Sequence, residues 1–364
     1  MKGHSLPHLK IPKVSFEGGA SRLHGGLIAY LQLGRSHTYP ADWLLCIVPF
    51  LAGGLDLFRF FVISVVMFFV HWVGFGENSL LDFTQGYDKS DPSKSHHPLS
   101  EGRLTVHQAS NAIHWTKAFL VSIVAILTLQ WAPNPLWAMI SLLLWVVWGT
   151  AYNIGLDKEN LFGFVPIVFC FVSMGAWGWF MSHDTMNLIG ASYLLYAGAV
   201  IMFQIAWSGH LKDLAQKETS NLLVRLGAKT EPYTKGTESY EMFLPGKTMY
   251  LGVFMKAVGI VSLLWLAYTV LRPINFNDPY TISILTWVGL IVLGMVASLF
   301  LIVPQRLWLK PRELRNMSIM EIFSIFAPVP LMLPWVEAIP LLVFALAYFY
   351  FANKALWGVS YPKV

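Results

Sequence analysis

Residues 57–77 read LFRFFVISVVMFFVHWVGFGE, and this stretch decides the fold. Its two formally charged residues, Arg59 and Glu77, stand near its ends. A helix that crosses the hydrocarbon core of a bilayer needs about 20 mostly apolar residues. The stretch therefore predicts a membrane-spanning helix.

The composition extends this conclusion to the whole chain of 364 residues. Hydrophobic residues make up 55% of it and charged residues 12%, with a mean hydropathy of +0.55. Because soluble domains carry about 25% charged residues, lipid is the expected solvent. The net charge of +5 comes from basic residues scattered over loops, so no nucleic-acid partner is expected. The two cysteines, Cys46 and Cys170, lie in apolar runs and show no disulfide spacing.

Further apolar runs predict an all-α, polytopic transmembrane bundle of about nine helices. The first run is short and ends at Gly53 and Gly54, and with the second it is expected to form a helical hairpin. The runs are 41–54, 57–77, 106–131, 135–153, 161–182, 187–208, 248–271, 281–303 and 327–351.

The basic residues indicate how these helices are oriented. With the N-terminus in the cytoplasm, all of the 25 Lys and Arg residues fall on the cytoplasmic side except Arg59, Arg272, Lys354 and Lys363. This favours nine helices in the cytoplasmic membrane. Residues 1–38, which lack a signal peptide, form a cytoplasmic segment, and residues 39–364 form the transmembrane domain. Its long loops, 78–105, 209–247 and 304–326, are then cytoplasmic, and functional residues are expected there.

Acidic and amide side chains follow the second predicted helix. Asn78 and Asp82 are four residues apart and would share a face of a continuing helix. Asp88 and Asp91 follow them. Oxygen ligands of this kind suit Mg²⁺, which proteins often share with substrate phosphates. A second loop, after the sixth predicted helix, carries Asp213 and Glu218, which could form the opposing half of such a site, although a solvated helix end would look similar.

These residues resemble the UbiA superfamily of intramembrane prenyltransferases. The family's first motif, N-D-x-x-D-x-x-x-D followed by P-L-P-S-G-R, is matched by Asn78, Asp82 and the segment HPLSEGR at 97–103. Ser79 replaces an Asp, Asp88 lies two residues late, and His97 replaces the usual Arg before the proline. A two-residue insertion near Gly86 would explain the displaced acid.

The family's second motif, K-D-x-x-D-x-E-G-D, is matched less completely. Lys212, Asp213 and Glu218 agree with it, and LVRLG at 223–227 resembles the downstream segment. Gln216 replaces the central Asp, and the Gly-Asp pair is missing. Tyr152 and Lys158 resemble the family's Tyr and Lys after the fourth helix.

The resemblance implies a UbiA-like fold and a Mg²⁺-dependent reaction of an isoprenoid diphosphate. The active-site residues would come from two loops, 78–105 and 209–247. Asn78, Asp82, Asp88 and Asp213 are the expected catalytic residues, and with Glu218 they are the expected metal ligands. The residues expected to bind substrate are Arg35, Lys94, His97, Arg103, Tyr152, Lys158 and Lys212. For Arg35, which precedes the first helix, a membrane-anchoring role is equally consistent. Aromatic faces can stabilise a carbocation. The ring-bearing residues near predicted helix ends on this side are His71, Trp72, Phe75, Tyr152 and Trp207.

Three functions are compatible with these residues. In the first, the prenyl group passes to a lipophilic or aromatic acceptor. In the second, the carbocation closes on its own chain, as in UbiA-type terpene cyclases, which the depleted second motif and the aromatic content of 15% also suit. In the third, a transporter, ionisable residues are expected near mid-membrane. The clustering of acidic residues at helix ends favours an enzyme.

Overall fold

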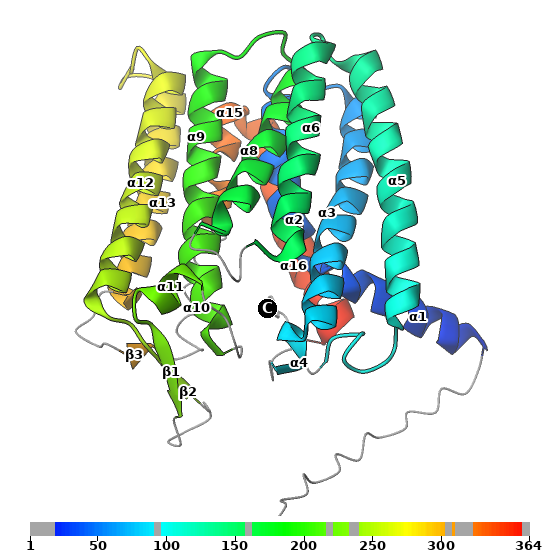
Figure 1. Ribbon diagram of the computed structural model, residues 1–364. Helices are drawn as coiled ribbons and strands as arrows, with labels where there is room; N and C mark the ends of the chain where they lie inside the picture. The colour runs from blue at the N-terminus through cyan, green and yellow to red at the C-terminus, as the bar shows by residue number, and fades with distance from the viewer. Residues whose placement is uncertain are drawn as a thin grey trace, which may run out of the picture.

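In the computed structural model the chain forms a bundle of long helices, and its longer connecting segments gather at one end of that bundle (Figure 1). The structure describes residues 19–90, 96–156, 162–215, 221–232, 240–302, 308–309 and 323–358. At the opposite end the connections, such as 132–134 and 181–187, are short. The two acidic segments therefore lie at the same end, as the sequence predicted.

Seven helices within these ranges are long and apolar enough to cross a membrane. Two of them include short continuations beyond the regular helix, which are described below. The seven are α3 (Leu57–Gln85), α5 (Val106–Trp131), α6 (Pro135–Ala151), α9 (Leu188–Met202), α12 (Gly246–Leu271), α13 (Pro279–Ile302) and α16 (Trp335–Trp357). The predicted polytopic helical bundle is confirmed. The count of nine spans stays a prediction, because α2 (Tyr39–Leu51) and α8 (Phe164–Phe180) have only 13 and 17 residues.

The two shorter helices pack against each other in the centre of the bundle. Nearly every residue of α2 is buried, and α8 meets it with a glycine surface. A Cβ atom added at Gly178 of α8 would collide with the Cys46 carbonyl oxygen of α2. On the neighbouring helix α9, Tyr193 donates a hydrogen bond of 2.6 Å to the Leu45 carbonyl of α2. Small residues allow helices in a membrane to approach closely. Gly178 therefore fixes how near α2 lies to α8.

The long helix α3 carries the first polar motif on its last turns. Asp56 caps its N-terminus by accepting a hydrogen bond from the Arg59 N–H, and Gly86, with φ 94°, caps its C-terminus. Asn78 and Asp82 therefore stand on a helix, and the predicted loop at 78–105 starts only at Gly86. A positive φ suits glycine, so the chain turns there into the short helix α4 (Tyr87–Ser90).

Two helices widen into π-helical segments at the same end. Helix α6 continues as η3 (Tyr152–Leu156), and α9 continues as η4 (Phe203–Gly209), α10 (His210–Lys212) and the 3₁₀ turn η5 (Asp213–Ala215). π-Helical turns are rare and often mark functional sites. Tyr152 and Asp213, both predicted site residues, lie in these modified ends.

The rest of the loop end contains shorter elements. They are α1 (Gly19–Leu33), η1 (Ser36–Thr38), α11 (Leu222–Arg225), and the strands β1 (Lys229–Pro232), β2 (Tyr240–Phe243) and β3 (Trp308–Leu309). The strands pair antiparallel in the order β1-β2-β3, with Thr230 opposite Met242 and Met242 opposite Leu309. These strands were not predicted from the sequence, which indicated an all-α fold.

The last predicted helix, 327–351, is divided in two. A short helix α15 (Val329–Met332) ends before Pro334, and α16 begins after it. Proline lacks an N–H and disfavours helical backbone in the residue before it, and Leu333 is extended at φ −126° and ψ 146°.

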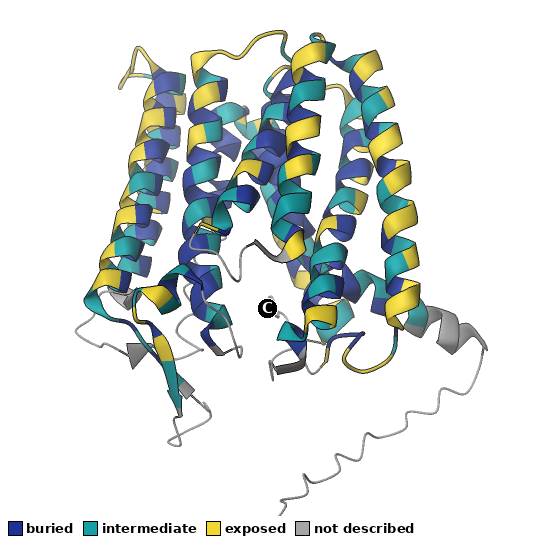
Figure 2. Cartoon of the chain, in the orientation of Figure 1, coloured by how far each residue is buried: buried dark blue, intermediate teal, exposed yellow. Residues whose placement is uncertain are grey.

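The outward faces of the long helices are exposed while their inward faces are buried (Figure 2). Phe58, Trp115 and Val336, all at least 69% exposed, belong to these outward faces, as lipid contact requires.

Candidate active site

A cavity of about 340 Å³ lies within the bundle, toward the end where the connecting segments gather. Its interior part is apolar and includes Leu45, Met67, Met174 and Ile201. Its polar lining comes from segments far apart in the chain. These polar residues are Arg35, His37, Thr38, Asp42, His71, Asn78, Asp82, Asp88, Tyr152, Asn153, Gln204, His210, Lys212 and Asp213.

The cavity brings together the described parts of both motifs. Asn78 and Asp82 enter it from α3, Asp88 from α4, and Lys212 and Asp213 from the continuation of α9. Arg35 and Tyr152 line it as well. Carboxylates from opposite sides and two cations thus share one enclosed volume.

Asp88 reaches the cavity because of the turn at Gly86. Helix α3 stops at Gln85, and the left-handed backbone of Gly86 separates it from α4, whose Asp88 lines the same cavity as Asp82. Asp88 is 2% exposed, and neither of its carboxylate oxygens has a hydrogen-bond partner among the described residues. A buried carboxylate without a partner is costly. Such a group fits a cation-binding role.

These oxygen atoms suit a divalent ion that is shared with a ligand. No three His, Cys, Asp or Glu side chains in the described part of the chain stand close enough to hold a metal by themselves. Mg²⁺ is commonly bound through one or two carboxylates, with waters and substrate phosphates completing its shell. The donor set of Asn78, Asp82, Asp88 and Asp213 therefore fits Mg²⁺ together with a phosphate ligand.

Arg35 is held in an unusual backbone conformation beside the cavity. Its φ of 46° and ψ of 40° make it the one non-glycine residue with positive φ in the described ranges. Its carbonyl oxygen accepts hydrogen bonds from the Thr38 hydroxyl at 2.9 Å and from His71 Nε2 at 3.1 Å. Its guanidinium lies 5.5 Å from the centre of the Phe75 ring. Strain of this kind concentrates at functional sites, where the surroundings must enforce it.

A buried pair, Asp42 and His71, holds the backbone of Arg35 in this conformation. His71 Nδ1 lies 2.6 Å from the Asp42 carboxylate, and the other ring nitrogen contacts the Arg35 carbonyl. Nε2 also lies 3.3 Å from the Thr38 hydroxyl, and toward the carbonyl, which can only accept, it can act only as a donor. Asp42 thereby orients the imidazole, and the imidazole positions Arg35.

Other predicted residues lie elsewhere. Lys94, Lys158 and Glu218 fall outside the described residues. His97 is buried but does not line the cavity. The Arg103 guanidinium bonds to the Glu101 carboxylate, the Gln32 amide oxygen and the His96 carbonyl, away from the lining. The substrate-binding roles of Lys94, His97, Arg103 and Lys158 and the metal-binding role of Glu218 stay predictions.

The aromatic residues divide in the same way. His71, Phe75 and Tyr152 line the cavity. Trp72 instead donates to the Tyr30 carbonyl at 2.6 Å, and Trp207 donates to the Thr248 carbonyl at 2.8 Å. Both indoles therefore tie helices together.

Six polar residues of the lining were not predicted from the sequence, and they are His37, Thr38, Asp42, Asn153, Gln204 and His210. Asp42 carried a usable signal, because an ionisable residue inside an apolar run is by default a functional candidate. Gln204 and His210 carried none, since their place in the cavity depends on the π-helical segment at the end of α9.

No family model and no curated protein matches the sequence. The structure does match solved structures. A digeranylgeranylglyceryl phosphate synthase aligns with a TM-score of 0.54 and 16% identity over 86% of this chain and 99% of the other. A UbiA homologue from Archaeoglobus fulgidus bound to GPP and Mg²⁺ aligns at 0.54, with 15% identity over 84% and 99%. The apo UbiA homologue from Aeropyrum pernix K1 aligns at 0.56, with 12% identity over 78% and 94%.

These likenesses extend over nearly the full length of the other proteins. At such low identity they bear on the fold, and the predicted UbiA-type fold is confirmed.

Proposed function

We propose that this chain, which has the fold of the UbiA homologues, is an integral membrane enzyme that ionises an isoprenoid diphosphate with Mg²⁺ and transfers the prenyl group to an acceptor. The observation that carries the proposal is the buried carboxylate of Asp88, which has no hydrogen-bond partner in the described ranges and shares one cavity with Asn78, Asp82 and Asp213. The bound GPP, DMAPP and Mg²⁺ in structures of the Archaeoglobus fulgidus homologue support it.

The polar end of the cavity would bind the metal ion and the diphosphate. Asn78, Asp82, Asp88 and Asp213 would hold Mg²⁺, which when bound offsets the negative charge that develops on the leaving diphosphate. The cationic side chains of Arg35 and Lys212 would bind diphosphate oxygens. The sequence resemblance adds Lys94, His97, Arg103 and Lys158 as further candidates for this binding and Glu218 as a further metal ligand. Tyr152 would orient the substrate from η3.

The apolar part of the cavity suits the isoprenoid chain. Leu45, Met67 and Met174 would pack against it and keep water from the carbocation. Phe75 and Trp145 also line the cavity, and aromatic faces stabilise cations. The apolar helices of the bundle support a location in a lipid bilayer. The distribution of basic residues in the sequence supports a site on the cytoplasmic side of the cytoplasmic membrane.

A second candidate, a UbiA-type terpene cyclase, is favoured by the aromatic lining. Phe75, Trp145, Tyr152, Phe171 and Phe349 all border the cavity. Such a surface would let the cation close on its own chain.

The proposal is tested with purified protein and farnesyl or geranylgeranyl diphosphate, without acceptor and then with candidate acceptors. We expect diphosphate release in Mg²⁺, its fall to background in EDTA, and its recovery with excess Mg²⁺. Analysis of the organic extract separates the two candidates, because a cyclic product formed without acceptor identifies a cyclase. Intact substrate under every metal and acceptor condition would contradict both.

Replacing His71 by alanine should slow diphosphate release by about 10²-fold, because Arg35 loses the donor that holds its backbone, and misplacement by about 1 Å has effects of this size. Asp42→Ala should act in the same direction. Since the two side chains act through one contact, the double variant should be little worse than either single variant. Steady-state release kinetics measure this.

His114→Ala, at an exposed position on α5, is the control and should match the parent. If the fold reduction in release rate of the double variant equals the product of the two single reductions, the shared positioning role is contradicted.

A further inference from the structure

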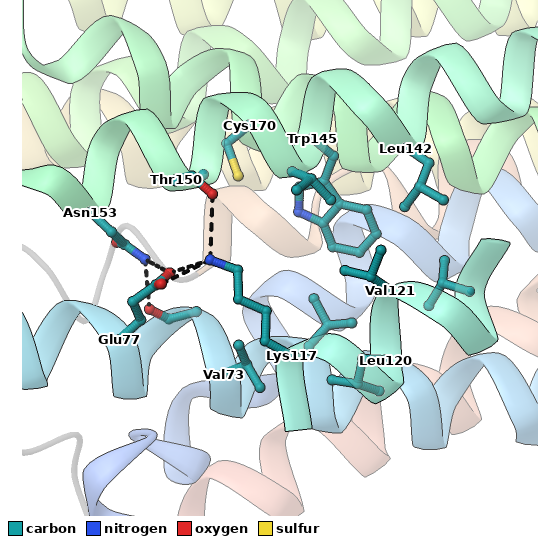
Figure 3. Close-up of a pocket in the computed structure, with 15 residues that line it drawn as sticks. Val73, Glu77, Lys117, Leu120, Val121, Leu142, Trp145, Thr150, Asn153 and Cys170 are labelled. Carbon is teal, nitrogen blue, oxygen red and sulfur yellow. Dashed lines mark hydrogen bonds and ion pairs between the residues drawn. The ribbon is translucent and has the colours of Figure 1, made fainter. Parts of the chain in front are cut away.

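A second, smaller pocket of about 130 Å³ lies between α3, α5 and α6 (Figure 3). Its walls are apolar and include Val73, Leu120, Val121, Leu142 and Trp145. Val121 is 39% exposed, so this side of the pocket is open to the surroundings of the bundle, which are lipid in a membrane. The pocket is thus accessible without passing through the main cavity.

One end of this side pocket carries a polar cluster. Lys117 Nζ lies 2.8 and 2.9 Å from the two Glu77 carboxylate oxygens and 3.4 Å from the Thr150 hydroxyl. Asn153 Nδ2 donates to Glu77 at 2.9 Å. Figure 3 shows Glu77, Thr150 and Asn153 gathered around the Lys117 ammonium, with Leu142 lying farther along the pocket. The cluster therefore combines hydrogen-bond donors and acceptors with a net charge near zero.

The side pocket and the main cavity share a wall. Val70, Gly74, Trp145, Gly149, Asn153 and Cys170 line both of them. Gly74 and Gly149 present no side chain there, and a Cβ atom at Gly74 would meet nothing within 4 Å. Glu77 directly precedes Asn78, so the polar cluster stands beside the acidic end of the cavity, at the same level along α3. A ligand in the side pocket would therefore lie next to the diphosphate end.

The chemistry of the side pocket selects its ligand. The paired charges of Glu77 and Lys117 give no net attraction for a diphosphate. An isoprenoid tail needs no polar partners, and the main cavity already has an apolar interior. A hydroxyl group, in contrast, can donate to the Glu77 carboxylate and accept from Lys117. The apolar walls and the lipid-facing side suit a hydrocarbon body.

We propose that the side pocket binds the prenyl acceptor, a neutral lipophilic molecule with a hydroxyl head group; this inference rests on the proposed transferase function. In the transfer, the hydroxyl oxygen forms a bond to C1 of the prenyl chain. The bond between C1 and the diphosphate oxygen breaks, and its electron pair leaves with the diphosphate. The hydroxyl proton passes to the Glu77 carboxylate, which Asn153 and Lys117 hold in place.

Photolabelling tests the side pocket without relying on turnover. The probe is a long-chain alcohol with a diazirine in its chain, and its matched control is the same chain without the hydroxyl. We expect the alcohol to label peptides of α3, α5 and α6. Val121→Trp, which fills the pocket, should lower this labelling about tenfold, whereas Val147→Trp on the exposed face of α6 should not. Glu77→Gln should weaken labelling by the alcohol and leave the hydrocarbon unaffected.

Diphosphate release is measured in parallel. Val121→Trp should keep the parent's KM for the prenyl diphosphate, because Val121 does not line the main cavity, but should transfer the prenyl group to the alcohol at least about tenfold more slowly. Equal labelling by alcohol and hydrocarbon would overturn the inference and identify a site for lipid chains. A changed preference for prenyl length in Val121→Trp would overturn it in favour of the prenyl tail. Absence of diphosphate release in the parent would instead refute the proposed function, while labelling still reports on the side pocket.

Discussion

Replacing Asp82 by asparagine is expected to lower the rate of diphosphate release by about 10³-fold, since loss of one preorganised electrostatic group at a reacting centre has effects of this order. Asp82 stands on α3 one turn beyond Asn78, and both line the polar end of the cavity. Asparagine keeps the size of the side chain and removes its charge, so metal affinity should fall with the rate. Release assays over a range of Mg²⁺ concentrations measure both quantities.

Asp184→Asn is the matched control, because Asp184 is exposed in the short connection at the opposite end of the bundle. It should behave like the parent. Asp88→Asn adds a sharper test. Activity should fall as in Asp82→Asn, but the midpoint of thermal unfolding without Mg²⁺ should rise, because the variant no longer buries an unpartnered charge. A fall of both activity and stability would indicate that Asp88 has a structural role.

The largest effect on stability is expected from Gly178→Ala. The added Cβ would stand 2.2 Å from the Cys46 carbonyl oxygen, which belongs to the backbone and cannot rotate away. Helices α2 and α8 would have to separate, and overpacking of this kind costs about 3 kcal/mol. Thermal unfolding of the detergent-solubilised protein, followed by loss of the monodisperse species, measures the change.

Gly289→Ala provides the control within the same substitution type. Gly289 lies in α13, is exposed, and has no atom within 4 Å of an added Cβ. Alanine favours a helix interior by about 1 kcal/mol over glycine, so this variant should be as stable as the parent or more stable. Equal stability of Gly178→Ala and Gly289→Ala would show that α2 and α8 do not need their close approach.

The first motif was predictable because it depends on local geometry. A spacing of four residues places Asn78 and Asp82 on one face of a helix wherever the helix lies. The position of Asp88 depended instead on where α3 ends, and this is set by the backbone of Gly86. The sequence suggested an insertion at that point but not the left-handed turn after which Asp88 still lines the cavity.

The parts that sequence reasoning missed depend on contacts between distant segments. Asp42 matters because α2 packs beside α3 and meets His71, and no local pattern reveals such a meeting. The pairing of Glu77 with Lys117 likewise needs α3 and α5 side by side. The division of the last predicted helix was within reach, because Pro334 interrupts its apolar run.

The length of α3 determines where the products of the proposed reaction can go. Its 29 residues span about 43 Å, whereas the hydrocarbon core of a bilayer is about 30 Å thick. With its first residues at one edge of that core, Asn78 and Asp82 reach the level of the lipid head groups, while the apolar interior of the cavity stays within the core. Cleavage at this boundary sorts the two products between two phases. The hydrophilic diphosphate departs into water and the prenylated product partitions into lipid, so neither has to cross the other's solvent.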